Sequence, residues 1–327
     1  MRVSDLGEQA LLRRLQAFCP PQVVGDDAAV LSIPEGQQLV VTTDTLIDGV
    51  HFALGLTSDL VTMDARDVGW RAMAANLSDL AAMGASPIGV TVGLGLPIDL
   101  EVDAVDDLYR GLTDCLLPQG GVILGGDMHR SPVVSLCITA LGQVHPTQVI
   151  RRSGACIGDA IVATGCHGRS RVGLELLLNP ELRAIAKDEA QPYIQAHRRP
   201  IPRLDVVPLL HTLQVTAGMD SSDGLADAVL QLCRSSGVGA QIHEEAISQP
   251  DLSWLSAEQS LEWSLYGGED FELVVCLPPA KATQLVQQLD GAAVIGTITT
   301  DTGVHLLNKL GQHRQKLHLD RGFQHFS

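Results

Sequence analysis

The sequence predicts a two-domain α/β protein in which helices and strands form α+β layers in each half. The chain has 327 residues, about twice the usual length of a single domain. Apolar strand patterns alternate with helical patterns in both halves, as expected where helices cover a sheet. Polar residues and glycines gather at 146–158. We therefore expect two domains, 1–147 and 148–327.

Composition limits the possible partners. Hydrophobic residues make up 45% of the chain and aromatic residues only 3%, so the cores must consist of Leu, Val, Ile and Ala. The formal net charge of −16 disfavours nucleic acid and anionic membranes. No stretch approaches the roughly 20 apolar residues that span a bilayer, and the N-terminus lacks a signal-peptide core. We expect a soluble, cytoplasmic protein that binds neither nucleic acid nor membrane.

The seven cysteines are scattered, and no two are spaced as Cys-x-x-Cys. Their odd number and spacing predict neither a zinc site nor a disulfide framework, which fits a reducing cytosol.

In the first half, the residue pattern predicts helices at 6–17, 64–83 and 102–117 and strands at 39–43, 88–96, 122–124 and 133–141. Gly84 and Pro87 stand where a helix over 64–83 should stop. The strand at 88–96 alternates glycine with apolar residues, as a buried strand can. The strands at 39–43 and 122–124 are expected to end at Asp44 and at Gly125-Gly126-Asp127.

In the second half, the pattern predicts strands at 159–164 and 273–277 and helices at 173–178, 181–195, 225–235 and 281–289. Glycines predict turns at 165–168 and 218–224. Pro200 and Pro202 exclude a helix over 198–203, which we interpret as a basic connecting loop.

Aspartates recur beside Gly, Ser or Thr after apolar runs. The positions are Asp26, Asp27, Asp44, Asp127, Asp220 and Asp223, with Glu269 and Asp270 in the same setting. Strand ends are where α/β proteins place their sites, and glycine lets the backbone approach a ligand closely. The alternative is that each aspartate only makes a turn or caps a helix.

Asp79 is the most informative single carboxylate. In the predicted helix 64–83 it shares a face with Ala75, Ala82 and Met83, so a charge lies on an apolar stripe. A buried carboxylate needs a cation or hydrogen-bond donors. The alternative is an ordinary structural partner such as Arg66 or a backbone amide.

Oxygen-rich clusters without Cys or paired His suit hard cations, Mg²⁺ above all. Several Mg²⁺ ions between carboxylates and phosphate oxygens are the usual means of phosphoryl transfer. The sequence lacks a Gly-x-x-x-x-Gly-Lys-Ser/Thr loop and the protein-kinase signatures. The sequence therefore predicts a phosphate-transferring enzyme that is neither a P-loop enzyme nor a protein kinase.

In these motifs the chain resembles the thiamine-monophosphate kinase family. The matching stretches are 24–29, 42–46, 49–52, 76–85, 125–127, 152–155, 222–225 and 267–273. Their order and spacing extend over nearly the whole chain. The resemblance implies transfer of the ATP γ-phosphate to thiamine monophosphate, giving thiamine diphosphate and ADP in thiamine diphosphate biosynthesis. It also implies a two-domain fold similar to aminoimidazole ribonucleotide synthetase and a homodimer formed through the N-terminal sheet.

The resemblance also assigns roles to residues. Ligands of several Mg²⁺ ions would be Asp27, Thr42, Thr43, Asp44, Asp79, Asp127, Asp220 and Asp223. ATP would contact Gly126, Asp127, Arg152 and Ser222, of which Asp127 and Arg152 would be catalytic. Thiamine monophosphate would contact His51, Glu269 and Phe323. His51 could instead be structural, and Phe323 could simply pack on the core.

Two departures leave questions open. Met128-His129-Arg130 stands where the family usually has Thr-Thr-Arg, so two hydroxyls near a metal are missing. The role of this turn beyond Asp127 is therefore left open. Tyr109 lies near a nucleotide contact of the family, in a helix too variable to carry that role over.

Two other functions compete. The first is another ATP-dependent enzyme of the aminoimidazole ribonucleotide synthetase superfamily, which would have its own characteristic residues. A selenophosphate synthetase needs a reactive Cys in a Gly-rich loop, which Phe18-Cys19-Pro20 lacks, and a hydrogenase maturation protein needs a terminal Cys. A non-catalytic nucleotide or metal sensor would not need all the acidic positions.

For the reaction itself we expect a direct transfer without a phosphoenzyme. The acceptor is already an anionic phosphate and needs no strong base, while charge repulsion is the main obstacle. Metal ions, Arg152 and in addition Arg130 would offset that charge. We expect the acidic residues of both halves to converge on one cleft.

Overall fold

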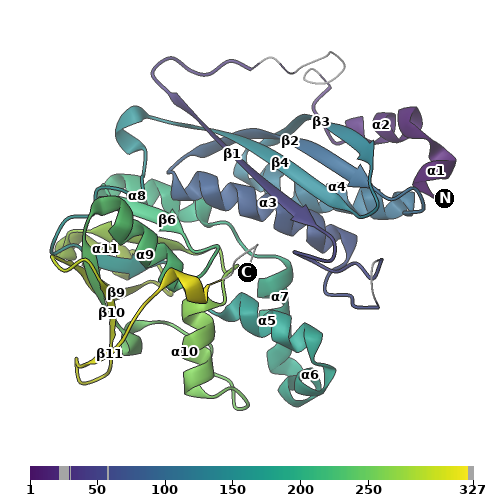
Figure 1. The fold of residues 1–327 in the computed structure, drawn as a ribbon. Coiled ribbons are helices and arrows are strands. Elements are labelled where there is room, and N and C mark those ends of the chain that lie inside the picture. Colours follow the sequence, from purple (N-terminus) through teal and green to yellow (C-terminus); the bar gives the residue numbers. More distant parts are fainter. Residues whose placement is uncertain (22–28, 30, 57–58, 323–327) are drawn as a thin grey trace. The chain divides into compact units, whose positions relative to one another are not determined.

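A computed structural model describes residues 1–21, 29, 31–56 and 59–322 (Figure 1). The chain divides into two compact units. The first contains Met1–Leu80 and Ala85–Pro146, and the second contains Ala81–Gly84 and Thr147–Ser327. None of the helices in the described part of the chain is long and apolar enough to cross a membrane.

The first unit is a sheet covered by helices on one face. Its elements are α1 (Val3–Leu6), α2 (Glu8–Gln16), β1 (Gln38–Ile47), α3 (Ala65–Ala82), β2 (Ser86–Leu96), α4 (Val102–Leu116), β3 (Val122–Arg130) and β4 (Ser135–Val144). The strand order is β1-β4-β2-β3. Only β2 and β3 run parallel to each other, whereas β4 pairs with β1 and β2 in antiparallel fashion.

The two faces of this sheet differ. Val90, Val92 and Ile138 are fully buried on the helix-covered face. On the other face, Leu39 and Val41 of β1 are 43% and 56% exposed. Because strand residues alternate between faces, every second residue of β4 from Leu136 to Val144 is buried, and the residues between them are more exposed.

Helices α3 and α4 cross at backbone contact. A Cβ atom on Gly69 would lie 2.0 Å from the carbonyl oxygen of Leu108, and one on Gly111 would lie 2.0 Å from that of Arg66. The two glycines therefore permit this crossing, which aligns α3 beneath the sheet.

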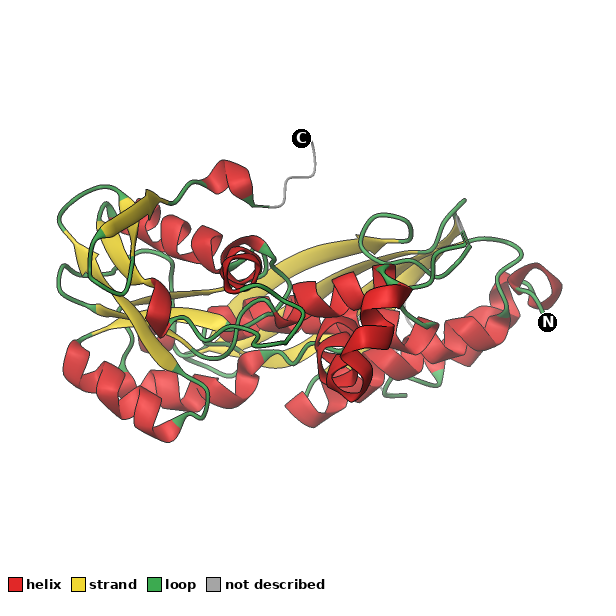
Figure 2. Ribbon diagram, turned by 90° about the horizontal axis from the view of Figure 1, so that it is seen from below, coloured by secondary structure: helices red, strands yellow, loops and turns green. Residues whose placement is uncertain are grey.

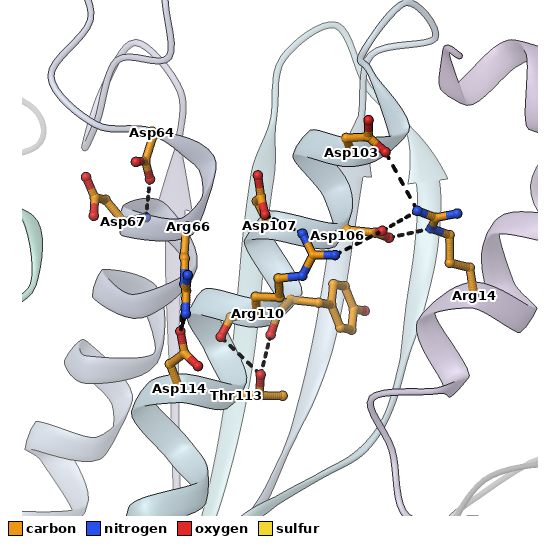
Figure 3. Close-up of polar contacts among 11 residues, drawn as sticks. Arg14, Asp64, Arg66, Asp67, Asp103, Asp106, Asp107, Arg110, Thr113 and Asp114 are labelled. Carbon is orange, nitrogen blue, oxygen red and sulfur yellow. Dashed lines mark hydrogen bonds and ion pairs between the residues drawn. The ribbon is translucent and has the colours of Figure 1, made fainter.

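Ion pairs fasten the N-terminal helices to α4 (Figure 3). The Arg14 guanidinium donates to both carboxylate oxygens of Asp106, which is 5% exposed. The helix expected over 6–17 is α2, which begins only at Glu8, because Gly7, with φ of 77°, separates it from the short helix α1.

The second unit is built around a larger sheet with strand order β11-β10-β7-β9-β5-β8-β6. Its helices are α5 (Arg169–Leu178), α6 (Pro180–Ala186), α7 (Ala190–Arg198), α8 (Val207–Leu213), α9 (Leu225–Ser236), α10 (Ala257–Tyr266) and α11 (Pro279–Gln288). Its strands are β5 (Ala160–Ala163), β6 (Ala217–Asp220), β7 (Gly239–His243), β8 (Leu273–Leu277), β9 (Ala293–Thr299), β10 (Val304–Leu307) and β11 (His313–Lys316).

Helices cover both faces of this second sheet (Figure 2). One core includes Val229 and Leu232 of α9, and another includes Leu210 of α8 and Leu285 of α11. A smaller cluster joins α5 to α7 around Leu176 and Ile194. Layers of helix and sheet in both units confirm the predicted fold class.

Two expectations about strand ends were wrong. Asp44 and Asp127 lie inside β1 and β3, which continue to Ile47 and Arg130. Thr45 and Ile47 are β-branched and extend the first strand, and Gly125 fits into the second at a register shift. Asp220, by contrast, is the last residue of β6.

Candidate active site

In the first unit, α3 contacts β1 through two side chains one turn apart. The Thr42 hydroxyl donates to the Asp79 carboxylate. The Asn76 side chain accepts a hydrogen bond from the backbone N–H of Asp44 at 3.2 Å and donates to the carbonyl of Ala72 at 3.0 Å. Asn76 and Asp79 share a helix face, so this turn of α3 fixes β1 where the predicted ligands lie.

The surroundings of Asp79 match the expectation. Its neighbours Ala75 and Ala82 are buried, at 9% and 8% exposure. Arg66, the alternative partner, pairs instead with Asp114 (Figure 3). The structure thus supplies a hydroxyl donor for Asp79, whereas Arg66 is engaged by Asp114.

Asp127 lies apart from this group within one chain. It is in register with Gly93, Cys137 and Thr45 across the sheet. Paired residues point to the same face, so Asp127 shares the exposed face with Thr43, whereas Thr42 and Asp44 point toward α3.

Strand order adds a separation in the plane of the sheet. β1 and β3 form opposite edges, with β4 and β2 between them. Three spacings of about 4.8 Å give about 14 Å between the strands that carry Asp44 and Asp127. Two carboxylates so separated, on opposite faces, do not hold the same ion within one chain.

His51 has a defined tautomer. Its Nδ1 accepts the backbone N–H of Ile47 at 3.1 Å, which places the proton of a neutral ring on Nε2. A sharp turn at Gly49, with φ of 83°, brings the ring back to the strand. The imidazole can therefore act as a hydrogen-bond donor through Nε2.

In the second unit, the segment 220–223 follows β6 directly. Asp220 is 3% exposed, and the Ser222 hydroxyl lies 3.4 Å from its carboxylate. Asp223 lies on the exposed side, one residue before Gly224 and the start of α9. The segment thus presents two carboxylates and a hydroxyl at the end of a buried strand.

Arg152 is close to the same place. Burial raises the pKa of Asp227, in the first turn of α9, and Asp223 raises it further, whereas Gln231 and then Arg152 lower it. The backbone of this arginine is held by Ser236, whose hydroxyl donates to the Arg152 carbonyl at 3.3 Å. The structure therefore places Arg152 and Asp223 each within electrostatic range of Asp227.

Glu269 lies in a strained turn beside Ser222. Its backbone N–H donates to the Ser222 carbonyl at 2.7 Å. Of the non-glycine residues with positive φ in the described chain, Glu269 at 61° and Phe271 at 52° both belong to this turn. The left-handed conformation costs such residues about 1–2 kcal/mol each, so other contacts must hold the turn.

Two carboxylates supply those contacts. Asp270 accepts the backbone N–H groups of Gly168 at 2.6 Å and Ser170 at 2.8 Å, at the start of α5. Glu272 accepts the Arg203 guanidinium at 2.5 Å and the Thr164 hydroxyl at 2.6 Å. Burial raises the pKa of Asp270 to about 7, against the hydrogen bonds from Ser170 and Gly168, which lower it.

Behind this turn lies a buried histidine. Nε2 of His167 is 3.0 Å from the Ser221 hydroxyl, and Nδ1 is 3.2 Å from the Gly165 carbonyl. Burial lowers the pKa of His167, which keeps the ring neutral. Its contact with Ser221 supports the acidic segment from inside the unit.

The available donors suit a hard cation. Thr42, Asp44 and Asp79 offer only oxygen atoms from one side of the first sheet, and such ligands are those that Mg²⁺ prefers. Within 1–21, 29, 31–56 and 59–322, no three carboxylate, His or Cys side chains are already gathered around one point. Asp27 and Phe323 lie outside the described residues.

Sequence reasoning missed several supporting residues. Asn76 belongs to the motif at 76–85 and Arg203 to the basic loop at 198–203, but neither was given a role of its own. The roles of His167, Asp270 and Glu272 depend on partners far along the chain, such as Gly168 for Asp270. A buried or strained setting for these groups has no local signal in the sequence.

Comparisons with known proteins give the class. The family model described as AIR synthase related protein, N-terminal domain, matches residues 25–144, and that described as its C-terminal domain matches residues 157–307. The chain is thus an AIR synthase related protein in both units.

Closer relatives give the particular family. A thiamine-monophosphate kinase of Synechococcus elongatus is 51% identical and covers 99% of this chain and 98% of its own. The crystal structure of thiamine-monophosphate kinase from Stenotrophomonas maltophilia K279a has 31% identity and a TM-score of 0.78, covering 90% of this chain and 95% of its own. AaThiL complexed with AMPPCP and TMP has 30% identity and a TM-score of 0.73, covering 96% and 97%. The chain belongs to the thiamine-monophosphate kinase family, and the resemblance seen in its motifs is confirmed.

Proposed function

We propose that this protein transfers the γ-phosphate of ATP to thiamine monophosphate, giving thiamine diphosphate and ADP, with Mg²⁺ as the required metal. The observation that carries the proposal is 51% identity to a thiamine-monophosphate kinase over 99% of the chain. A complex of AaThiL, 30% identical, with AMPPCP and TMP supports the same pair of substrates. The two units would then be the N-terminal and C-terminal domains, 1–147 and 148–327, of a two-domain enzyme.

The chain's own residues have distinct tasks in this proposal. Arg152 holds the phosphates of ATP with Gly126 and Ser222. His51 donates from Nε2 to the phosphate of the acceptor, and Glu269, with Phe323, contacts the rest of it. None of these steps removes a proton from the acceptor, because its phosphate is already ionised near neutral pH.

The acidic residues would hold the metal. Asp27, Thr42, Thr43, Asp44 and Asp79 belong to the first unit, Asp220 and Asp223 to the second, and Asp127 to the edge strand β3. Mg²⁺ ions, when bound, would neutralise part of the charge of the two meeting phosphates. Asp79 and Asp220 accept hydrogen bonds from the Thr42 and Ser222 hydroxyls, which orient the two carboxylates.

We further propose a two-fold homodimer through the exposed face of the first sheet. Leu39 and Val41 lie on that face, which has no helix over it in the described part of the first unit. Because Asp44 and Asp127 of one chain lie at opposite edges of the sheet, a second copy would supply the missing Asp127. A cytoplasmic location fits seven cysteines that are all free thiols.

Turnover of the purified protein tests the function. ATP, Mg²⁺ and thiamine monophosphate together should yield ADP and thiamine diphosphate in equal amounts, and unphosphorylated thiamine should be a poor substrate. ATP binding without any ADP release would favour the sensor instead. With a chiral γ-phosphorus, direct transfer gives inversion, and retention would contradict it.

A further inference from the structure

The turn at 268–272 is held at both ends by groups far away in the sequence. Asp270 is buried and binds the first turn of α5 through two backbone N–H groups, 2.6 and 2.8 Å away. Glu272 binds Arg203 and Thr164, and Arg203 also donates to the Thr164 carbonyl at 3.1 Å. Both anchors belong to the second unit and act on neighbouring residues of one turn.

Between these anchors the backbone is in an unfavourable conformation. Glu269 and Phe271 have positive φ, and so does Gly268, at 67°. A Cβ on Gly268 would lie 2.7 Å from the Ser222 carbonyl, so the turn also presses closely on that segment. Without external contacts, residues such as Glu269 would return to an extended or right-handed conformation.

This backbone conformation determines where the side chain of Glu269 lies. Its side chain is 38% exposed and lies 3.9 Å from the buried ring of His197. His197 in turn contacts the Ser170 hydroxyl at 3.0 Å, next to one of the N–H groups that Asp270 binds. A chain of contacts thus links Asp270 through Ser170 of α5 and His197 of α7 to the side chain of Glu269.

We infer that Asp270 is a positioning residue for thiamine monophosphate, and that the Arg203–Glu272 pair is a second, weaker one. The two anchors hold the turn in the left-handed conformation that directs Glu269 toward the acceptor. This inference rests on the proposed function, since it takes Glu269 as an acceptor contact. It assigns neither anchor a contact with substrate or metal.

Asp270→Asn tests the first anchor. The amide keeps the shape but offers one oxygen, so its NH₂ group faces one of the two backbone donors. We expect the KM for thiamine monophosphate to rise roughly tenfold, the effect of one charged hydrogen bond, while the KM for ATP stays within about twofold. Amide hydrogen exchange at Gly168 and Ser170 should become faster in this variant.

Asp159→Asn is a matched control. Asp159 is 5% exposed in the same unit and accepts the backbone N–H of Cys156 at 2.9 Å and the Thr216 hydroxyl at 2.6 Å. It lies at the other end of β5 from Thr164 and makes none of the contacts that hold the turn. Its replacement should lower the melting temperature but leave the ratio of the two KM values unchanged.

Arg203→Lys tests the second anchor even if Asp270→Asn does not fold. Lysine keeps the charge but cannot contact Glu272, Asp205 and the Thr164 carbonyl together. We expect the KM for thiamine monophosphate to rise about threefold, again without a matching change for ATP.

Equal changes in both KM values, or a lower melting temperature alone, would overturn the inference. An inactive wild-type protein would refute the proposed function instead. In that case the exchange rates of Gly168 and Ser170 would still report whether Asp270 holds the turn.

Discussion

The two units hold their acidic residues in different ways. In the first unit, Asp44 and Asp79 lie on a regular strand and a regular helix, and Asn76 and Thr42 link those elements. In the second, Glu269 lies in a turn with positive φ that two buried anchors maintain. The first arrangement involves no backbone strain, whereas the second stores strain in order to direct one side chain.

The difference indicates what each unit contributes. Carboxylates on unstrained elements can adjust to a cation, so changing them should affect the chemistry more than the folding. A strained turn needs all its anchors, so changes there should affect stability and recognition of the acceptor together. The predictions below test this distinction.

The largest effect is expected at Asp79. Asp79→Asn keeps an acceptor for the Thr42 hydroxyl but removes the charge, so kcat/KM should fall by about 100-fold or more with little loss of stability. ADP release and thermal unfolding measure the two quantities. Asp114→Asn, which breaks the pair with Arg66 on α3, is the control and should keep most of the activity. A variant of Asp79 with nearly normal turnover would remove this residue from the proposed site.

A second prediction concerns the separation of Asp127 from Asp44 and Asp79. If a site combines Asp79 of one chain with Asp127 of another, then mixed Asp79→Asn and Asp127→Asn chains should complement each other. Random pairing makes half the dimers mixed, each with one intact site, so activity should recover to roughly a quarter of wild type. The chains are mixed, unfolded, refolded together and assayed. If all ligands came from one chain, the mixture would stay as inactive as its components.

Much of the fold could be predicted because its signals are local. The helix expected at 64–83 is α3, Ala65–Ala82, and the strand expected at 273–277 is β8. The helix ends at Gly84, whose φ is 71°. Glycine favours this left-handed conformation at helix ends, so the end of the helix could be predicted from the sequence. The short strands β7 and β10 were missed because polar residues interrupt their apolar runs, whereas β8 is one continuous apolar run.

The types of residue in the site could be predicted from the sequence, but the contacts that hold those residues in place could not. Motifs identified Asp79, Asp220 and Glu269, because carboxylates beside glycine and serine are visible in the sequence. The anchor of Asp270 was not visible, since its partners Gly168 and Ser170 stand about 100 positions earlier. Sheet order decides where Asp127 lies, and strand order depends on pairing across the whole unit.

A third, smaller effect separates strain from recognition at Glu269. Both Glu269→Ala and Glu269→Gly remove the carboxylate, so both should weaken binding of the acceptor. Glycine accepts a φ of 61° without strain, so the glycine variant should be more stable than the alanine variant by about 1 kcal/mol. Urea unfolding measures this difference.

The matched control is the same pair of changes at Glu181, in the first turn of α6. There the backbone is helical, and alanine should be the more stable choice by about 0.5–1 kcal/mol. The same order at both positions would mean that the turn at Glu269 is not strained.

The last prediction concerns a pH dependence that Asp270 adds to stability. Burial raises its pKa to about 7 in the folded protein, against an ordinary value of 3.8. Between these two values the folded protein keeps the proton that the unfolded chain has released. The contribution of Asp270 is therefore complete below about pH 4 and is lost as the pH rises to about 7, with a slope of at most about 1.4 kcal/mol per pH unit.

Asp270→Asn has no such titration, so a comparison of the two proteins isolates the contribution of Asp270. The free energy of unfolding of the wild type, minus that of the variant, should therefore decrease steadily between about pH 4 and pH 7 and level off above. Urea unfolding at several pH values, followed by the fluorescence of Trp254 and Trp263 in the same unit, measures it. A difference that stays constant or grows with pH would show that the two backbone N–H groups outweigh burial. The carboxylate would then be charged over this whole pH range, and it would hold the turn as an ionic cap of α5.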